Sequence, residues 1–153
     1  MEINKETKTI TMSKIYDAPR DLVWNVSTDK NLIPEWWGPS QYTTKVVEMD
    51  MRAGGKWRFV QTDKDGKEEA FRGEYKEVNA PESFTWTFEW EGMPGHILTE
   101  TYKYEATEDN KTKVTSYTVF DTLEDLEGMV ATGMEGGATE TMERLGKLLE
   151  SKK

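Results

Sequence analysis

The stretch Pro34-Glu35-Trp36-Trp37-Gly38-Pro39 marks the point at which the pattern of the sequence changes. Two adjacent tryptophans between two prolines form a stiff segment whose large apolar rings are costly to leave in water. Before this segment, polar and apolar residues alternate over Thr9–Tyr16, which predicts a strand. Two short helices are expected to follow, at about residues 19 to 28 and from Asp29 into the tryptophan pair.

After the tryptophan pair, period-two alternation predicts a long antiparallel meander. Its clearest strand is Ser83–Trp90, in which four aromatic residues alternate with small or charged ones. The turn signal Asp63-Lys64-Asp65-Gly66 joins the two strands on either side of it into a hairpin. A strand and two short helices followed by a meander indicate an α+β fold with a sheet of about six or seven strands.

The segment from Asp121 to Lys153 predicts a long C-terminal helix, because its apolar residues recur at steps of three or four. These residues are Leu126, Val130, Met134, Ala138, Met142, Leu145 and Leu149. Four glycines interrupt the pattern, and each costs about 1 kcal/mol relative to alanine inside a helix. We therefore expect the regular helix to begin near Glu135, and residues 127 to 134 to form a loop, a bend or a mobile lid.

The composition favours a single acidic domain over residues 1–153. The chain has 20 basic and 29 acidic residues and a net charge of −9, so its field repels phosphate backbones and nucleic acid is not an expected partner. The absence of cysteine excludes disulfides and thiolate metal sites and fits the cytoplasm. No segment is apolar enough to span a membrane. We expect a monomer or weak homodimer that has no metal or cofactor.

The alternation places many aromatic residues on the sheet face that the last helix must cover. They are Trp57, Phe59, Phe71, Tyr75, Trp86, Phe88, Trp90, Tyr102 and Tyr104, and Leu98 lies among them. One interpretation is that a helix of methionines and alanine does not fill the space above these rings, which leaves a cavity between sheet and helix. The alternative is that the side chains interdigitate at normal interior density.

Five motifs resemble one family. They are Lys14–Trp24, Trp36–Pro39, Gly54–Phe59, Phe71–Tyr75, and Gly133–Ala138 with Met142–Leu145. Over nearly the whole chain the sequence is similar to homologues of the heat-shock-protein-90 ATPase activator C-terminal domain, in the START-like or SRPBCC superfamily. The resemblance implies a helix-grip, Bet v-type fold, in which a curved antiparallel sheet wraps around a long C-terminal helix.

The resemblance also implies a function. Relatives in the superfamily bind lipids, polyketides or plant hormones, so we expect a hydrophobic or aromatic small molecule, lipid-like or polyketide- or flavonoid-like, between the sheet and the last helix. The residues expected to line its site are Trp36, Trp37, Trp57, Phe59, Phe71, Tyr75, Trp86, Phe88, Leu98, Glu100, Tyr102, Met134, Ala138 and Met142. Two alternatives remain open, namely a chaperone-interacting module like the activator and an enzyme of the cyclase or dehydratase kind.

Two further expectations concern the walls of this site. One indole of the tryptophan pair should close the end of the space between sheet and helix, and the other should pack against Trp24 or the first strand. The sequence leaves open which of them faces inward. The family often has Gly-Trp at the start of the last helix, where this chain has Gly137-Ala138. If Ala138 faces the sheet, the missing indole leaves room for a ligand or for repacking by methionines.

Glu100 and His96 are candidates for chemistry. Glu100 falls between Leu98 and Tyr102 on the inward face, where burial would raise its pKa and make it an acid or a base. One alternative is that the assumed alternation is shifted by one residue, so that Glu100 faces outward. The other is that Glu100 pairs with a cation at a strand edge. The candidate cations are Arg58, Arg72 and Lys103. His96 is the only histidine and has no recognisable triad or metal partners, so we assign no catalytic residue.

Overall fold

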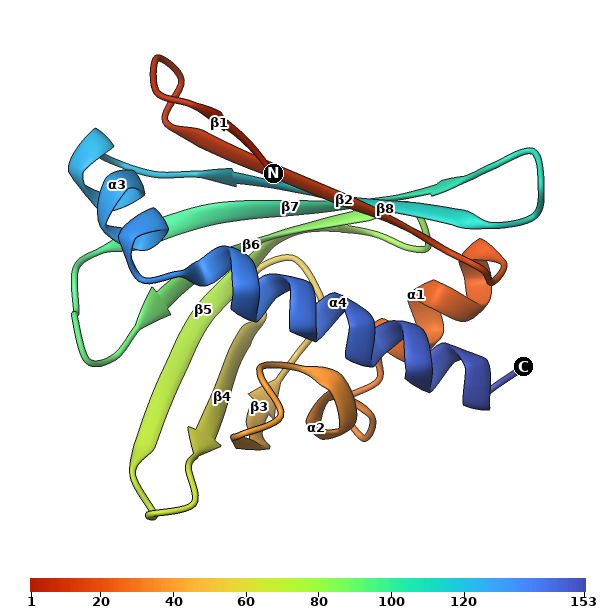
Figure 1. Ribbon diagram of the computed structural model, residues 1–153, viewed down its shortest axis with the longest axis horizontal. Coiled ribbons are helices and arrows are strands. Elements are labelled where there is room, and N and C mark those ends of the chain that lie inside the picture. Colours follow the sequence, from red (N-terminus) through yellow and green to blue (C-terminus); the bar gives the residue numbers. More distant parts are fainter.

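The computed structural model describes residues 1–153, which form eight strands and four helices. In chain order these are β1 (Glu2–Asn4), β2 (Thr9–Tyr16), α1 (Arg20–Thr28), α2 (Ile33–Trp36), β3 (Thr43–Met49), β4 (Lys56–Thr62), β5 (Glu68–Asn79), β6 (Ser83–Trp90), β7 (Ile97–Ala106), β8 (Thr112–Val119), α3 (Leu123–Ala131) and α4 (Met134–Ser151). The strands form one antiparallel sheet in the order β1-β2-β8-β7-β6-β5-β4-β3 (Figure 1).

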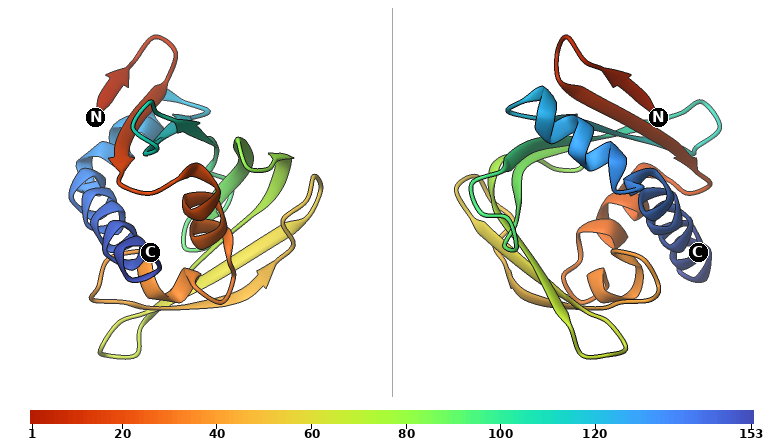
Figure 2. Two further views of the ribbon diagram at one scale, coloured as in Figure 1. Left: turned by 90° about the vertical axis from the view of Figure 1, so that its right-hand side faces the viewer. Right: turned by 60° about the vertical axis from the view of Figure 1, so that its left-hand side comes forward.

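The sheet is curved, and α1, α2 and α4 lie on its concave side (Figure 2). This arrangement confirms the expected helix-grip fold, with two short helices between the first long strand and the meander. The sheet has eight strands, more than expected, because β1 pairs with β2. The three exposed residues of β1 are too few to show an alternation in the sequence.

The helix α2 is a single turn with Pro34 near its start, where no intrahelical N–H donor is needed. None of the helices combines the length and apolar character that crossing a membrane requires.

The expectation of a loop, bend or lid over residues 127 to 134 is wrong for most of that segment. Thr122 caps α3 by accepting a hydrogen bond from the backbone N–H of Asp125 at 3.0 Å. Gly133 then turns the chain into α4 with a φ of +78°, a conformation that costs glycine little because it has no Cβ. Although Gly136 and Gly137 lower the helix propensity, α4 begins at Met134, because packing of an apolar face stabilises helices in proteins more than propensity does.

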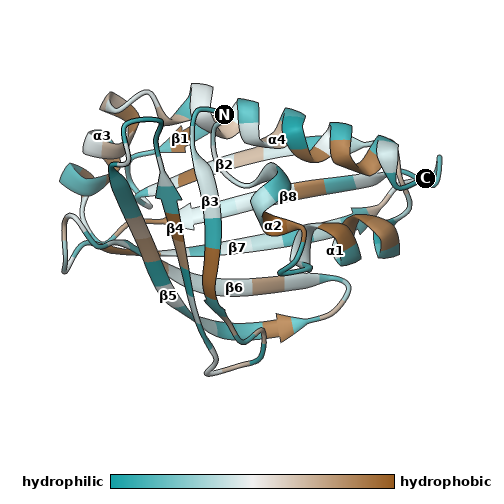
Figure 3. Cartoon of the chain, turned by 90° about the horizontal axis from the view of Figure 1, so that it is seen from below, coloured by the Kyte–Doolittle hydropathy of each residue, from teal (hydrophilic) through white to brown (hydrophobic).

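The buried residues form two separate clusters. The larger has fourteen members and joins the aromatic side chains of β4 to β7 with α1 and with Leu145 and Leu149 of α4. The smaller consists of Ile10, Leu98, Phe120 and Leu126. Figure 3 shows how hydrophobic residues alternate with hydrophilic ones along α1 and α4, as expected for helices that cover a sheet.

Trp57 lies at the centre of the larger cluster and is only 1% exposed. Its ring stacks on that of Trp86, with centroids 4.1 Å apart, and its indole N–H donates to the carbonyl oxygen of Thr87 at 3.1 Å. Gly73 is the cross-strand partner of Trp57, and a Cβ on this glycine would lie 1.8 Å from the carbonyl oxygen of Thr87 and 2.6 Å from the indole nitrogen. The glycine therefore leaves room for this carbonyl group and for the ring that donates to it.

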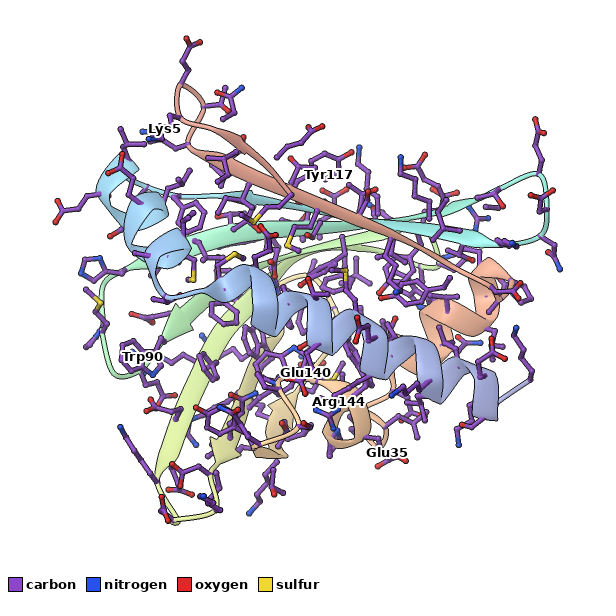
Figure 4. The ribbon with its side chains drawn as sticks, in the orientation of Figure 1. Lys5, Glu35, Trp90, Tyr117, Glu140 and Arg144 are labelled. Carbon is purple, nitrogen blue, oxygen red and sulfur yellow. The ribbon has the colours of Figure 1, made fainter.

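Trp90, the last of the four aromatic residues of β6, does not follow the predicted inward pattern. Its side chain lies at the rim of the sheet, 39% exposed, and its indole N–H donates to Glu69 at 2.7 Å (Figure 4). The other three aromatic residues of the strand face the concave side as expected. The alternation holds along the strand, but the final position lies beyond the part of the sheet that the helices cover.

Candidate functional site

A cavity of about 340 Å³ lies between the concave face of the sheet and α4. Its wall includes Trp86 and Leu145 from the larger buried cluster and Ile10 and Phe120 from the smaller one. The cavity therefore borders both clusters of the core. Protein interiors contain few voids larger than a water molecule, so this partly open space is not filled by interdigitating side chains. Of the two interpretations of the aromatic face, the structure supports the cavity.

Most of the residues predicted for the site line this cavity. They are Trp36, Trp37, Phe71, Trp86, Phe88, Leu98, Glu100, Tyr102, Met134, Ala138 and Met142. Phe59 and Tyr75 line only a second, smaller cavity of about 40 Å³, and Trp57 lines neither because it is enclosed by its aromatic neighbours. Ala138 lines the cavity from α4, as the hypothesis about its missing indole requires. The role of these residues in binding stays a prediction.

Several residues of the wall were absent from the prediction. The strand β8 contributes Val114, Ser116 and Thr118, and Phe120 follows directly after it. Their alternation does place them on the inner face, but small and polar side chains give no sign of a ligand site. Met129 also lines the cavity and belongs to α3, in the segment for which the glycines favoured a loop, a bend or a lid over a regular helix.

The tryptophan pair contributes both of its indoles to the main cavity. Trp37 packs edge-on against Phe59 and Phe71, with centroid distances of 5.0 and 5.6 Å. Trp36 borders both cavities, and its indole N–H is buried without a hydrogen-bond partner, which costs about 1–3 kcal/mol. The expectation that one indole faces inward and the other packs elsewhere is therefore wrong.

Trp24, the predicted neighbour of one of these indoles, instead packs edge-on against Phe84 and Tyr104. Tyr104 is further held by its hydroxyl group, which lies 2.7 Å from that of Ser27 on α1. Burial raises the pKa of Tyr104 to about 12, so the phenol is neutral at physiological pH. The contact closes the end of the cavity at which α1 meets β7.

Polar contacts hold the tryptophan segment against α4. The guanidinium group of Arg144 donates to the backbone carbonyl oxygens of Glu35, at 3.0 Å, and Gly38. Ser40 donates from its backbone N–H and its hydroxyl group to the carboxylate of Glu140, at 3.2 and 2.6 Å, and these hydrogen bonds lower the pKa of Glu140. Figure 4 shows Glu35, Glu140 and Arg144 grouped beside the middle of α4. The two indoles are thus fixed from both ends of their segment.

Glu100 is the polar centre of the cavity. It lies on β7, directly opposite Trp86 of β6 and Thr118 of β8. The indole N–H of Trp86 donates to Oε1 at 2.9 Å, and the hydroxyl group of Thr118 donates to Oε2 at 3.0 Å. Burial raises the pKa of Glu100, and hydrogen bonds from the side chains of Trp86, Tyr102 and Thr118 offset part of that rise because they stabilise the carboxylate.

No cation pairs with Glu100. The candidate partners lie elsewhere: Arg58 binds Glu91 and Arg72 binds Glu89, at 2.7 and 3.0 Å. Lys103 lies over the ring of Tyr117, 5.3 Å from its centroid. The prediction that Glu100 lies on the inward face of the sheet is therefore correct, and the alternative of an ion pair at the strand edge is not observed.

His96 lies outside the cavity, in the connection between β6 and β7. Its Nδ1 is 2.8 Å from the carboxylate of Asp125, so it joins this connection to α3. The structure contains no group of three or more histidine, aspartate or glutamate side chains arranged to hold a metal ion.

A curved antiparallel sheet that grips a C-terminal helix, with an apolar cavity between them, defines a helix-grip protein of the START-like class. The family model for Activator of Hsp90 ATPase homolog 1-like protein matches residues 17–150. The chain therefore belongs to that family, as the five motifs indicate. Membership supports a ligand-binding module or a module like the activator.

Solved structures agree with this assignment. Protein Ms6760 from Mycobacterium smegmatis is 25% identical, with 99% of this chain and 97% of that chain covered and a TM-score of 0.87. A protein from Staphylococcus epidermidis is also 25% identical, with 100% and 96% covered and a TM-score of 0.83. DynU16, a protein of the dynemicin biosynthetic locus, shares the fold at 18% identity and a TM-score of 0.70, with 95% of this chain and 48% of that chain covered. No curated protein matches the chain.

Proposed function

We propose that the protein binds a hydrophobic or aromatic small molecule in the cavity between the sheet and α4. The observation that carries this proposal is the cavity itself, because 18 of its 27 lining residues are hydrophobic. Its volume of about 340 Å³ lies near the lower end of the range of roughly 300–1,000 Å³ that is usual for ligand sites. This size favours a molecule of one to three rings, or a short acyl chain, over a lipid with two long chains.

The chemistry of the wall supports an aromatic ligand. Phe71, Trp86 and Phe88 offer ring faces and edges from the sheet, and offset or edge-to-face contacts between rings stabilise a complex beyond the area that they bury. On the helical side the wall includes Met134 and Met142, whose flexible thioethers adapt to different apolar shapes. Such a site suits a flat, largely apolar molecule with few polar groups.

A thermal-shift screen against lipids and flavonoid-like aromatics tests the proposal. A ligand that binds only the folded state stabilises it by about 2.7 kcal/mol when its concentration is a hundred times Kd. In a domain of this size that corresponds to a rise in Tm of roughly 5–10 °C. Native mass spectrometry should then show one ligand per chain. If no compound in a broad panel raises Tm, the proposal is wrong as stated.

Trp37→Ala is expected to weaken binding of such a ligand by about tenfold or more, because it removes one wall of the cavity together with its contacts to Phe59 and Phe71. Titration calorimetry would measure the affinity, and circular dichroism would check that the variant still folds. Tyr117→Ala is the matched control, since this ring is 37% exposed and lines no cavity described above. If Trp36→Ala and Trp37→Ala both only unfold the protein, the pair is structural.

The two alternatives have their own support. Family membership favours a module that acts on a chaperone, and a pull-down with purified Hsp90 that recovered no complex would count against it. An enzyme of the cyclase or dehydratase kind needs a carboxyl group with an altered pKa and further polar groups beside it. Glu100, with Thr118 and Tyr102 beside it, meets this requirement. If the protein converts a polyketide-like substrate and Glu100→Gln abolishes that turnover, an enzyme would be favoured over a protein that only binds.

A further inference from the structure

The charges along the cavity wall are strongly asymmetric. Glu100 is its one carboxyl group, and no lysine, arginine or histidine lines it. The other ionisable side chains on the wall are the phenols of Tyr16, Tyr102 and Tyr104, and burial raises the pKa of all three, which keeps them neutral. The cavity therefore has one group that can carry a negative charge and none that can carry a positive one.

The carboxyl group of Glu100 also retains unused capacity to accept hydrogen bonds. A carboxylate offers about four acceptor sites, two on each oxygen. Trp86 occupies one site on Oε1 and Thr118 one site on Oε2, and the hydroxyl group of Tyr102 interacts with the same carboxylate, which leaves at least one acceptor site for a ligand. Because the indole N–H can only donate, these partners favour a carboxylate that accepts hydrogen bonds. Glu100 is partly shielded from water, and a carboxylate in such a place without a cation is costly, so a positively charged ligand would offset part of that cost.

We propose that the cavity selects an apolar organic amine, bound as its ammonium ion, with the charged group at Glu100 and the hydrophobic body along the aromatic wall. This inference rests on the binding function proposed above and adds the chemical class of the ligand. The ammonium group donates to the carboxylate at an acceptor site that Trp86, Thr118 and Tyr102 leave free. The rings of Trp86 and Tyr102 lie beside that position, and aromatic ring faces attract organic cations.

The same charges disfavour two other classes of ligand. A fatty acid or another organic anion would bring a second negative charge into a cavity that has no cation to receive it. An alcohol or phenol of the same shape can donate a single hydrogen bond but leaves the charge of Glu100 unpaired. The net charge of −9 acts in the same direction, since it attracts cations to the protein and repels anions.

Three naphthalene derivatives of similar size test the inference, namely 2-(1-naphthyl)ethylamine, 2-(1-naphthyl)ethanol and 1-naphthylacetate. Titration calorimetry at neutral pH should give an affinity for the amine about 10- to 100-fold higher than for the alcohol, the range expected for a hydrogen bond between charged groups. The carboxylate should bind more weakly than either. This comparison uses the unaltered chain, so it does not depend on the folding of a variant.

Glu100→Gln should remove most of the preference for the amine, while the affinity for the alcohol changes by less than about threefold. The matched control is Glu105→Gln, which removes the same charge from an exposed position on the same strand. It should leave all three affinities unchanged. If the control lowers the affinity for the amine as much as Glu100→Gln does, the effect comes from the overall charge and the inference is wrong.

The remaining outcomes separate this inference from the binding function. If the alcohol or the carboxylate binds as tightly as the amine, the inference is overturned and the binding function stands. If the amine binds equally well to Glu100→Gln, the ammonium group does not lie at Glu100 and the inference is again overturned. If none of the three compounds binds, both the choice of an amine and the binding of small aromatic molecules are contradicted.

Discussion

Trp57→Ala is expected to lower the free energy of unfolding by about 3–5 kcal/mol, the range found when a fully buried large aromatic side chain is truncated. The ring stacks on Trp86 and contacts Phe59 and Phe88, so its loss leaves a hole inside the larger buried cluster. The hydrogen bond to the carbonyl oxygen of Thr87 is lost as well. Because a small domain is stabilised by only about 5–15 kcal/mol in total, the variant should unfold at a much lower denaturant concentration.

Urea unfolding followed by tryptophan fluorescence and circular dichroism would measure this change, provided that the slope of the transition stays the same. Trp90→Ala is the matched control, because that side chain lies at the sheet rim and is 39% exposed. We expect it to cost about 1 kcal/mol or less. A loss below about 1 kcal/mol for Trp57→Ala would mean that the stacked rings do not organise the core.

The fold was predictable because the aromatic residues alternate so regularly. In β6, Phe84, Trp86 and Phe88 define the buried face without any knowledge of the neighbouring strands. The signal fails where it depends on few residues, as in the three-residue β1, or where a glycine lowers helix propensity but the helix still forms, as at Gly128 in α3. It also fails at Trp90, because periodicity does not indicate where the sheet extends beyond the helices that pack on it.

The candidate site was predictable only in part, because its polar contacts depend on strand register. The inward phase of Glu100 follows from alternation, whereas its partners Trp86 and Thr118 follow from the pairing of β7 with β6 and with β8. Register is set by turns and bulges across the whole sheet, which a local pattern does not report. The contacts of Arg144 with the tryptophan segment join parts of the chain more than a hundred residues apart and have no local signal.

Ala138→Trp is expected to abolish ligand binding, with a loss of affinity of more than about 100-fold, while the protein stays folded. Ala138 lines the cavity from the first turns of α4, so an indole at this position would occupy the space proposed for the ligand. The cavity of about 340 Å³ can receive the ring, and the additional apolar area that it buries should keep Tm unchanged or raise it.

Thr139→Trp supplies the control, because the neighbouring residue adds the same ring at an exposed position of α4. It should retain the affinity of the unaltered chain for 2-(1-naphthyl)ethylamine, measured by titration calorimetry beside Ala138→Trp. Unchanged binding in Ala138→Trp would place the ligand outside the cavity. Equal losses of affinity in both variants would mean that the effect comes from a change in α4 as a whole. Only a loss of affinity confined to Ala138→Trp, with Tm maintained, shows that the ligand and the indole compete for one space.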